Sequence, residues 1–260
     1  MESVDSFFGN TFATQDITFD EARTVIHQAF VGKDKTPAEP ILAFLIEPSA
    51  RSMTQVDLNL PVTFLIGVAV YELIHVFNCT YIGERDKESG NLMSCMLVRE
   101  YDPHQKPSWF LGLKSAWSAF SCFLQMRRSG GGAVPGLCLF TDSKYKTLEL
   151  KLQAENFDKN TQIWHKEHGP AEKHLYVCML GVHPDHQGKG LGSKIMESLN
   201  DLADSKSMKC YLECSGAKNI AFYEKCGYTT YADEVLTDPT DKSRFIDGKV
   251  MIRQPRPRSS

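Results

Sequence analysis

Residues 174–193 have the sequence HLYVCMLGVHPDHQGKGLGS. The first half is an almost unbroken apolar run of strand length, which indicates a central β-strand that is buried on both faces. Apolar side chains then recur every three or four positions, as on one face of an amphipathic helix: Leu191, Ile195, Leu199 and Leu202. A glycine-rich turn therefore joins the end of a strand to the first turn of a helix.

This turn has the chemistry of an anion-binding site. The first N–H groups of a helix have no partner inside the helix, and the helix dipole favours negative charge there. Two phosphate-binding motifs fit poorly, because a P-loop needs glycine where His183 stands and the dinucleotide fingerprint needs glycine where Ser193 stands. A third pattern, Q-x-x-G-x-G, is matched at Gln187, Gly190 and Gly192.

The residues that follow extend this pattern. KCYLECS, residues 209–215, has the composition of a short strand, and a short helix follows from Asn219, with Gly227 placed to end it before another strand. In this order, residues 174–232 resemble the acetyltransferase (GNAT) superfamily, whose pyrophosphate loop has the form Q-x-x-G-x-G. The sequences HPDHQGKGLGS and LECSGAKNIAFYEKCGY are most similar to those of the puromycin N-acetyltransferase branch.

The resemblance implies an α+β fold, the GNAT fold, in which helices flank a mixed central β-sheet that is splayed at the acetyl-CoA site. It also implies an N-acetyltransferase with acetyl-CoA as cosubstrate, in which a primary amine of a small molecule attacks the thioester directly. The alternatives are a protein N-terminal or lysine acetyltransferase, and a non-catalytic CoA-binding regulatory module. We expect no metal, although His165 and His168, like His183 and His186, have the spacing H-x-x-H.

The resemblance assigns the cofactor contacts to three places. The backbone of the turn would hold the pyrophosphate, free edge groups of the splayed strand would pair with the pantetheine and polarise the thioester, and Asn219 would cap its helix or bond the pantetheine. The predicted cofactor-binding residues are Leu180, Gly181, Val182, Gln187, Gly188, Lys189, Gly190, Leu191, Gly192, Ser193 and Asn219.

Two residues are candidates for proton transfer. Tyr223 stands where the family places the acid that protonates the departing thiolate, and without the resemblance it is a core aromatic beside Phe222. A tyrosine with a pKa of about 10 can protonate a thiolate whose thiol has a pKa of about 8.5. Glu213 is the candidate base for the acceptor ammonium, with Glu100 as the fallback; alternatively Glu213 is structural and a water relay serves.

Three elements are expected upstream of the motif. Thr18 and Glu21 form the pattern of a capping box, which predicts a first helix. The runs NCTYIGE and LMSCMLVR, separated by RDKESGN, predict a β-hairpin. Val62–Gly83 is long enough to span a membrane, but Glu72 and His75 favour a buried helix that runs into a strand.

We expect a single acetyltransferase domain over residues 1–252. A short helix is predicted around Ile41–Ile46, and an aromatic-rich buried helix is predicted over Ser108–Met126. A helix is expected to start near Thr141 and to give way at Gln153 to a polar surface excursion, as part of an insertion of about residues 141–172.

Composition excludes several classes of protein. The 260 residues carry 29 Lys and Arg against 32 Asp and Glu, a formal charge of −3, and the basic residues are scattered apart from RQPRPRSS, residues 253–260, an expected disordered tail. Without a basic stripe, nucleic acid is a poor partner.

The eight cysteines form no C-x-x-C pair and the N-terminus lacks the pattern of a secretory signal, so we expect buried free thiols and a cytoplasmic protein. The oligomeric state stays open.

Overall fold

The computed structural model describes residues 17–32, 39–50, 66, 69–70, 73, 77–105 and 147–257. The helices in these ranges are α2 (Phe19–Val31), α3 (Pro40–Ala50), α7 (Thr147–His168), α8 (Leu191–Ser205) and α9 (Ala217–Lys225), with a 3-10 turn, η3, at Pro184–His186. The strands are β1 (Thr80–Arg85), β2 (Leu92–Tyr101), β3 (His174–Val182), β4 (Lys209–Ser215), β5 (Thr229–Thr237) and β6 (Phe245–Arg253).

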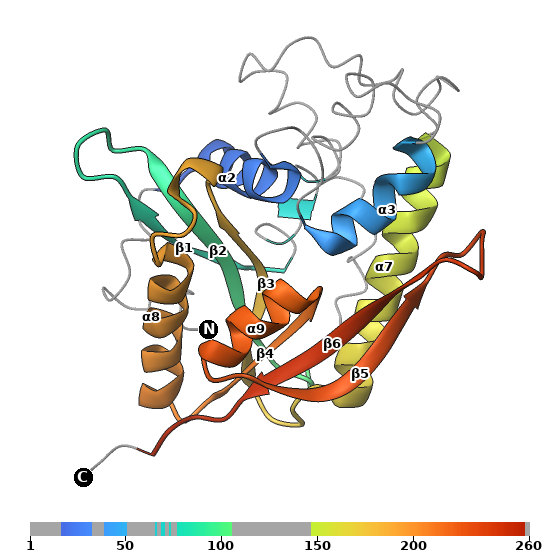
Figure 1. Cartoon of the computed structure of the whole chain (residues 1–260). Helices are drawn as coiled ribbons and strands as arrows, with labels where there is room; N and C mark the ends of the chain where they lie inside the picture. The colour runs from blue at the N-terminus through green and yellow to red at the C-terminus, as the bar shows by residue number, and fades with distance from the viewer. Residues whose placement is uncertain are drawn as a thin grey trace.

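The six strands form one mixed sheet in the order β1-β2-β3-β4-β6-β5 (Figure 1). β3 and β4 are parallel, and the other neighbouring pairs of described strands are antiparallel. A parallel pair needs a crossover, which α8 supplies. The predicted hairpin, the strands before and after the glycine turn, and the short helix α3 are confirmed. β6 is an element that the sequence pattern missed, and it lies between β4 and β5.

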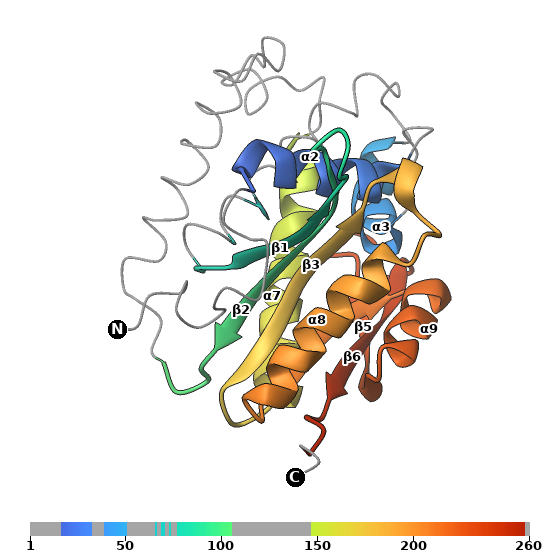
Figure 2. The same cartoon turned by 90° about the vertical axis from the view of Figure 1, so that its left-hand side faces the viewer.

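Helices cover both faces of this sheet (Figures 1 and 2). α8 packs on one face, here called the α8 face, through Ile195, Met196 and Leu199, and α9 lies on the same side. The opposite face, here called the α7 face, is covered by α2 over β2 and β3 and by α3 and α7 over the half that contains β6. The predicted α+β architecture of a mixed sheet with flanking helices is therefore confirmed.

The N-terminus of α2 contains the predicted capping box. The N–H of Glu21 donates to Oγ1 of Thr18 at 3.3 Å, and the N–H of Thr18 donates to Oε2 of Glu21 at 2.9 Å. Arg85, at the end of β1, donates to both carboxylate oxygens of Glu21 at 2.5 and 3.0 Å, and this pairing lowers the pKa of Glu21 to about 2. A two-point contact of this kind fixes the direction of α2 relative to the hairpin.

β3 and β4 pair over three residues, His174–Tyr176 with Lys209–Tyr211. Beyond Tyr176, β3 stays paired with β2 as far as Val182, while β4 stays paired with β6 as far as Ser215. The two parallel strands therefore separate, and the predicted splay is present in the sheet. We call the space between them the β3–β4 gap.

A β-bulge lies on β3 at the point where the strands separate. The register of β3 against β2 skips one residue at Cys178. A bulge bends its strand and increases the local twist, which directs β3 away from β4. It also changes which residues face each side, since Val177 and Leu180, three positions apart, both pack in the core under α8.

The prediction of a polar surface excursion after Gln153 is wrong, because most of this segment belongs to α7. The helix continues to His168 and buries Gln153 and Trp164, which are 0% and 4% exposed. Nδ2 of Asn156 in the same helix donates to the carbonyl of Thr237 on β5 at 2.9 Å. The face of α7 that packs on the sheet is thus partly polar, and this polarity hides the apolar periodicity by which such a helix is recognised.

The end of β6 corrects a second prediction. Arg253 is 3% exposed, and its guanidinium donates to both carboxylate oxygens of Asp204 at 2.8 and 2.7 Å. The N–H of Arg256 donates to the same carboxylate at 2.7 Å. A disordered tail that starts at residue 253 is therefore wrong; residues 258–260 lie outside the described part of the chain.

Two further expectations fall largely or wholly outside the described residues. The helix expected over Ser108–Met126 lies entirely outside them. Of the buried helix expected within Val62–Gly83, residues 66, 69, 70 and 73 are described and helical, and Phe77 lies in a turn. Among the residues that the structure describes, no helix combines the length and the apolar character needed to cross a membrane.

The packing of α7 makes a prediction about stability. Trp164→Ala should lower the free energy of unfolding by about 3–5 kcal/mol, because it leaves a cavity between α7 and the sheet. The neighbouring Ile163 is 39% exposed, so Ile163→Ala should cost less than about 1 kcal/mol. Urea unfolding followed by circular dichroism measures both values. Similar losses for the two variants would contradict the packing of α7 on the sheet.

Candidate functional site

The turn between β3 and α8 presents open backbone. Gly188 and Gly190 both have a φ of +78°, and a Cβ at either position would meet nothing within 4 Å. Their backbone conformation, rather than a lack of space, therefore calls for glycine. Gly190 is the N-cap of α8 and no side chain caps this helix. The first N–H groups of α8 are thus left for an anion.

Two other residues of the turn connect it to the rest of the fold. Nε2 of Gln187 donates to the carbonyl of Val182 at 3.1 Å and closes the turn onto the end of β3. A Cβ on Gly192 would lie 3.3 Å from Cζ of Phe222 on α9. Gly192 therefore permits close packing between α8 and α9, which brings α9 next to the turn.

Leu191 and Ser193 belong to the first turn of α8, and lysines stand before and after them. Nζ of Lys194 bonds Oε2 of Glu84 at 2.8 Å, which neutralises much of its charge. Nζ of Lys189 lies 3.5 Å from Nδ1 of His186 and has no carboxylate partner among the described residues. Lys189 is therefore the available cation of the turn.

The edge of β3 that faces the β3–β4 gap offers two backbone amides. The N–H of His183 donates to the carbonyl of Met93 on β2 at 2.8 Å. Because amides alternate in direction along a strand, Gly181 also points toward β2, and Leu180 and Val182 point into the gap. The prediction of a free edge amide at Gly181 is therefore wrong.

Gly181 has a packing role instead. A Cβ at this position would lie 3.0 Å from both the Cβ of Ala29 and the Cδ1 of Ile26. These atoms belong to α2, so a side chain at residue 181 would push α2 off the sheet. The glycine is thus required for the close approach of α2 to β3.

Glu213 lies on β4 at the edge of the gap, on the α7 face. The hydroxyl of Tyr211 donates to Oε1 of Glu213 at 2.8 Å. Burial raises the pKa of Glu213 to about 7, while hydrogen bonds from Tyr211 and Tyr176 oppose the shift. A carboxyl group with a pKa near neutrality can accept a proton at the pH of the cell and pass it on.

Glu100, the fallback base, has a different environment. It lies opposite Leu175 in the β2–β3 register, and Leu175 packs in the core under α8. Oε1 of Glu100 is 3.4 Å from Nζ of Lys173, an exposed lysine. Glu100 is therefore on the other side of the sheet from Glu213, in a surface ion pair.

Tyr223 lies on α9 and approaches the gap from the α8 face. Its ring packs against those of Phe222 and Tyr228, with centroids 5.1 and 6.0 Å away. Burial, followed by the nearby Cys214, raises the pKa of Tyr223 above its ordinary value, and no hydrogen bond from a described residue opposes this shift. The phenol therefore keeps its proton over a wide pH range.

Asn219 is not the cap of α9, which corrects the first of its two predicted roles. The N-cap is Gly216, and Asn219 is the third residue of the helix. Nδ2 of Asn219 donates to the carbonyl of Ser215 at 3.1 Å and fastens α9 to the end of β4. A bond from Asn219 to pantetheine stays a prediction.

Sequence patterns did not single out two charged residues near the gap. Oε2 of Glu39 accepts from the N–H of Leu42 at 2.6 Å at the start of α3, and the charge of Glu39 contributes to the raised pKa of Tyr223. Pro40 in the next position is the available signal, because proline favours the first position of a helix. Arg99 on β2 favours the ionised form of Glu213, and no motif marks it.

The thiols of β4 are poorly suited to act as nucleophiles. Burial raises the pKa of Cys210 to about 11 and that of Cys214 to about 12. The thiolate is the reactive form of cysteine, and it is scarce at neutral pH for both residues. The described cysteines are free thiols, and the chemistry of this site favours transfer without a covalent cysteine intermediate.

The histidines of the first H-x-x-H pair separate in the structure. His165 is stacked between Tyr101 and Tyr211, with both ring centroids at 4.1 Å, and its Nε2 lies 2.7 Å from Nε2 of His174. Burial lowers the pKa of His165 to about 3, so it is neutral at the pH of the cell. This cluster fills the space between α7 and the sheet.

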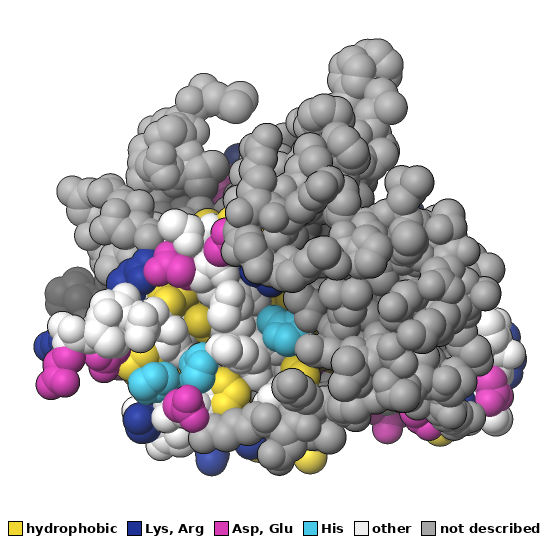
Figure 3. Space-filling model, turned by 90° about the horizontal axis from the view of Figure 1, so that it is seen from above, with side chains coloured by type: hydrophobic (Ala, Val, Ile, Leu, Met, Phe, Trp, Pro, Cys, Tyr) yellow, Lys and Arg dark blue, Asp and Glu magenta, His cyan; other side chains and the backbone are white. Residues whose placement is uncertain are grey.

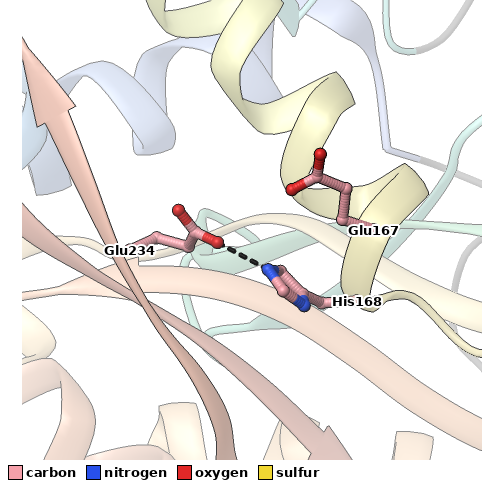
Figure 4. A group of neighbouring side chains, drawn as sticks. All are labelled: Glu167, His168 and Glu234. Carbon is pink, nitrogen blue, oxygen red and sulfur yellow. Dashed lines mark hydrogen bonds and ion pairs between the residues drawn. The ribbon is translucent and has the colours of Figure 1, made fainter.

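His168 points instead to β5 (Figure 4). Its Nε2 lies 2.5 Å from Oε1 of Glu234, and Glu167 offers an oxygen within 4.8 Å of both atoms. Glu167 is exposed, and the direct contact between His168 and Glu234 leaves little space for an ion between them. We interpret this contact as a hydrogen bond that holds α7 to β5.

The surface at the end of the molecule that carries the glycine turn has mixed charge. Seen from above, the described part of this face has histidine, acidic and basic side chains interspersed (Figure 3). A nucleic-acid surface requires clustered positive charge. This part of the surface therefore lacks that character.

The acetyltransferase (GNAT) family model matches residues 156–228. These residues run from α7 through the β3–β4 gap and the glycine turn to the end of α9. A solved structure, the putative arylalkylamine N-acetyltransferase 7 of the yellow fever mosquito, superposes with a TM-score of 0.51, at 9% identity over 91% of this chain and 83% of that one. The protein has the GNAT fold.

Curated relatives match part of the chain. An uncharacterized N-acetyltransferase of Schizosaccharomyces pombe is 31% identical over 84 residues, 32% of this chain and 33% of the relative. The glucosamine 6-phosphate N-acetyltransferase of the same organism is 51% identical over 47 residues, 18% of this chain and 41% of the relative. The chain thus spans between a third and two fifths of the length of these relatives.

The GNAT match assigns the glycine turn and the gap to one recognised unit. It starts inside α7, so that the second half of this helix lies within the region that the family shares. Acetyl-CoA fits the residues present, because the uncapped start of α8 suits a pyrophosphate and the free amides on β3 suit an amide chain.

The environment of Glu213 makes a prediction about titration. Carbon NMR of the Glu213 carboxyl should give a pKa of about 7. Tyr211→Phe removes a hydrogen bond to the ionised form and should raise this pKa further. Tyr231→Phe, at a tyrosine that is 65% exposed, is the control and should leave it unchanged. A carboxyl that titrates at the ordinary value for glutamate would contradict the burial of Glu213.

Proposed function

We propose that this protein is an N-acetyltransferase that transfers the acetyl group of acetyl-CoA to a primary amine of a small molecule. The observation that carries the proposal is the arrangement around the β3–β4 gap. An uncapped helix start lies at one end of it, and Glu213 and Tyr223 approach it from opposite faces. The amine would attack the thioester directly, in a complex that holds both substrates.

The glycine turn would hold the pyrophosphate through backbone N–H groups. The contacts would come from Gln187 to Ser193, with Gly188 and Gly190 supplying the left-handed conformation and Lys189 adding positive charge. The N–H groups of Leu180 and Val182 would pair with the pantetheine and stabilise negative charge on the thioester oxygen. Donors placed in this way are often worth about 3–4 kcal/mol each in the transition state.

Two side chains would move the protons. Bound acetyl-CoA supplies an acetyl group activated as a thioester. Glu213, ionised above its pKa of about 7, would take a proton from the acceptor ammonium, and Tyr223 would donate its proton to the departing thiolate. Their places on opposite faces fit this division, since the acceptor would enter from the α7 face and the carrier from the α8 face.

Other acceptors and roles are alternatives. A protein N-terminus or lysine is the second class of acceptor, and a non-catalytic CoA-binding module is the third possibility. The relationship to puromycin N-acetyltransferases and the cytoplasmic location remain predictions from the sequence. A raised carboxyl pKa at the gap favours catalysis over binding alone, because a binding module has no need of a group that titrates near neutrality.

The binding step has a matched control within the chain. Gly190→Ala should weaken CoA binding at least about tenfold, because a Cβ there strains the left-handed turn and hinders the pyrophosphate. Gly90, in the β1–β2 turn, has a φ of +72° and equally open surroundings. Gly90→Ala should therefore cost similar stability and leave CoA affinity unchanged, as calorimetry would measure. Equal effects on affinity would place the CoA site elsewhere.

The chemical step should depend on both side chains. With labelled acetyl-CoA and an amine panel, Tyr223→Phe should lower kcat by about 10–100-fold, and Glu213→Gln should lower it by about 100-fold or more. In the wild type, kcat/KM should fall as the pH drops below about 7, because protonated Glu213 cannot accept a proton, and Glu213→Gln should lose this limb.

Glu100→Gln is the control for Glu213→Gln and should retain the wild-type pH profile. An unchanged rate in Tyr223→Phe would remove Tyr223 from the mechanism. Tight CoA binding with no transfer to any amine or peptide would replace the enzyme with the regulatory module.

A further inference from the structure

Arg99 is a positive charge with no counter-ion among the described residues. Its guanidinium carbon lies 4.9 Å from the ring centroids of Phe77 and Tyr101 and 5.4 Å from that of Tyr176. Its Nε is buried and has no hydrogen-bond partner, and no described residue forms an ion pair with it. The aromatic rings stabilise a cation through their faces, but they do not satisfy the buried Nε–H donor.

This environment sets Arg99 apart from other arginines in the described residues. Four of them bond a carboxylate: Arg23 with Asp20, Arg85 with Glu21, Arg244 with Asp238 and Arg253 with Asp204. A guanidinium has five N–H donors in a planar fork that matches carboxylate and phosphate groups. A partly buried fork with no partner is costly unless a ligand pairs with it.

Arg99 lies on the face of the sheet from which the acceptor would enter. It is opposite Tyr176 in the β2–β3 register, and Tyr176 is opposite Tyr211 in the β3–β4 register. Glu213 is two residues further along β4, with its side chain on the same face as that of Tyr211. Strand spacing and rise place the Cα atoms of Arg99 and Glu213 about 12 Å apart. This separation is within the combined reach of the two side chains and a short acceptor.

We propose that Arg99 binds an oxyanion, a carboxylate or a phosphate, on the amine acceptor, so that the preferred substrate carries both an amine and a negative charge. The inference rests on the proposed function and narrows its substrate class. The planar fork would hold the oxyanion while the aromatic rings keep the guanidinium in place. The amine, a few bonds away, would then lie near Glu213.

The test uses pairs of acceptors that differ in the anion. β-Alanine is compared with propylamine, and phosphoethanolamine with ethanolamine, in acetyl transfer by the full chain at a pH above the acid limb. Wild type should favour the anionic member of at least one pair in kcat/KM. Arg99→Met should lower kcat/KM for that member by about 10–100-fold, mainly through KM, and for the neutral member by less than about 3-fold.

Two further variants separate binding from loss of structure. Lys173→Met removes a charge from an exposed lysine close in the sequence to β3 and should leave both members of each pair unchanged. Arg99→Lys keeps the charge without the fork and should be intermediate between wild type and Arg99→Met. Thermal unfolding and CoA affinity of each variant should match those of the wild type; where Arg99→Met fails to fold, Arg99→Lys supplies the comparison.

The outcomes distinguish this inference from the proposed function. Transfer without preference for the anionic member, or an equal loss on both members in Arg99→Met, overturns the role of Arg99 and leaves the acetyltransferase in place. If no amine is acetylated, calorimetry with β-alanine and phosphoethanolamine on the CoA-loaded protein decides the matter. If the wild type binds these compounds and Arg99→Met does not, the result supports the oxyanion site alone. If the wild type binds neither compound, both the oxyanion site and the proposed acetyltransferase function are overturned.

Discussion

The separation of β3 from β4 is the constraint on which the rest of the site depends. Parallel strands normally stay paired along their length, and here the pairing stops after three residues. The bulge at Cys178 bends β3, while the close approach of α2 over Gly181 holds β3 to β2. Each strand therefore has a partner on its outer side, and the inner edges stay unpaired without breaking the sheet.

Burial at this gap sets the chemistry of its side chains. The same loss of solvent raises the pKa of Glu213 toward neutrality and makes the thiols of Cys210 and Cys214 unreactive. Tyr223 stays protonated for the same reason. A carboxyl that can take a proton and a phenol that can give one are thus produced by desolvation, with Arg99 and the neighbouring tyrosines adjusting the balance.

The sequence predicted those parts of the fold that local patterns determine. The strand, glycine turn and helix at 174–205, the capping box at Thr18 and the β1–β2 hairpin each follow from residues that are close along the chain. The continuation of α7 beyond Gln153 and the strand β6 were missed. α7 packs through a partly polar face that includes Gln153, and β6 takes its place in the sheet by pairing with strands far away in the sequence.

The candidate site shows the same division between features set by local patterns and features set by contacts far apart in the sequence. The motif located the turn, Glu213 and Tyr223, but the shift at the bulge, which removes Gly181 from the free edge, needs the register of β2 against β3. Arg99 and Glu39 also escaped notice, since neither belongs to a motif and their importance comes from what surrounds them in space.

The position of β6 has a consequence for how the chain is made. β6 is the last strand of the described residues, yet it lies between β4 and β5, and β5 joins the sheet through it alone among these strands. During synthesis, β4 therefore has no partner on its outer side until residues 245–253 have left the ribosome. Such long-range pairing is slow to form, so a nascent chain would carry an unpaired outer edge on β4 until β6 pairs with it.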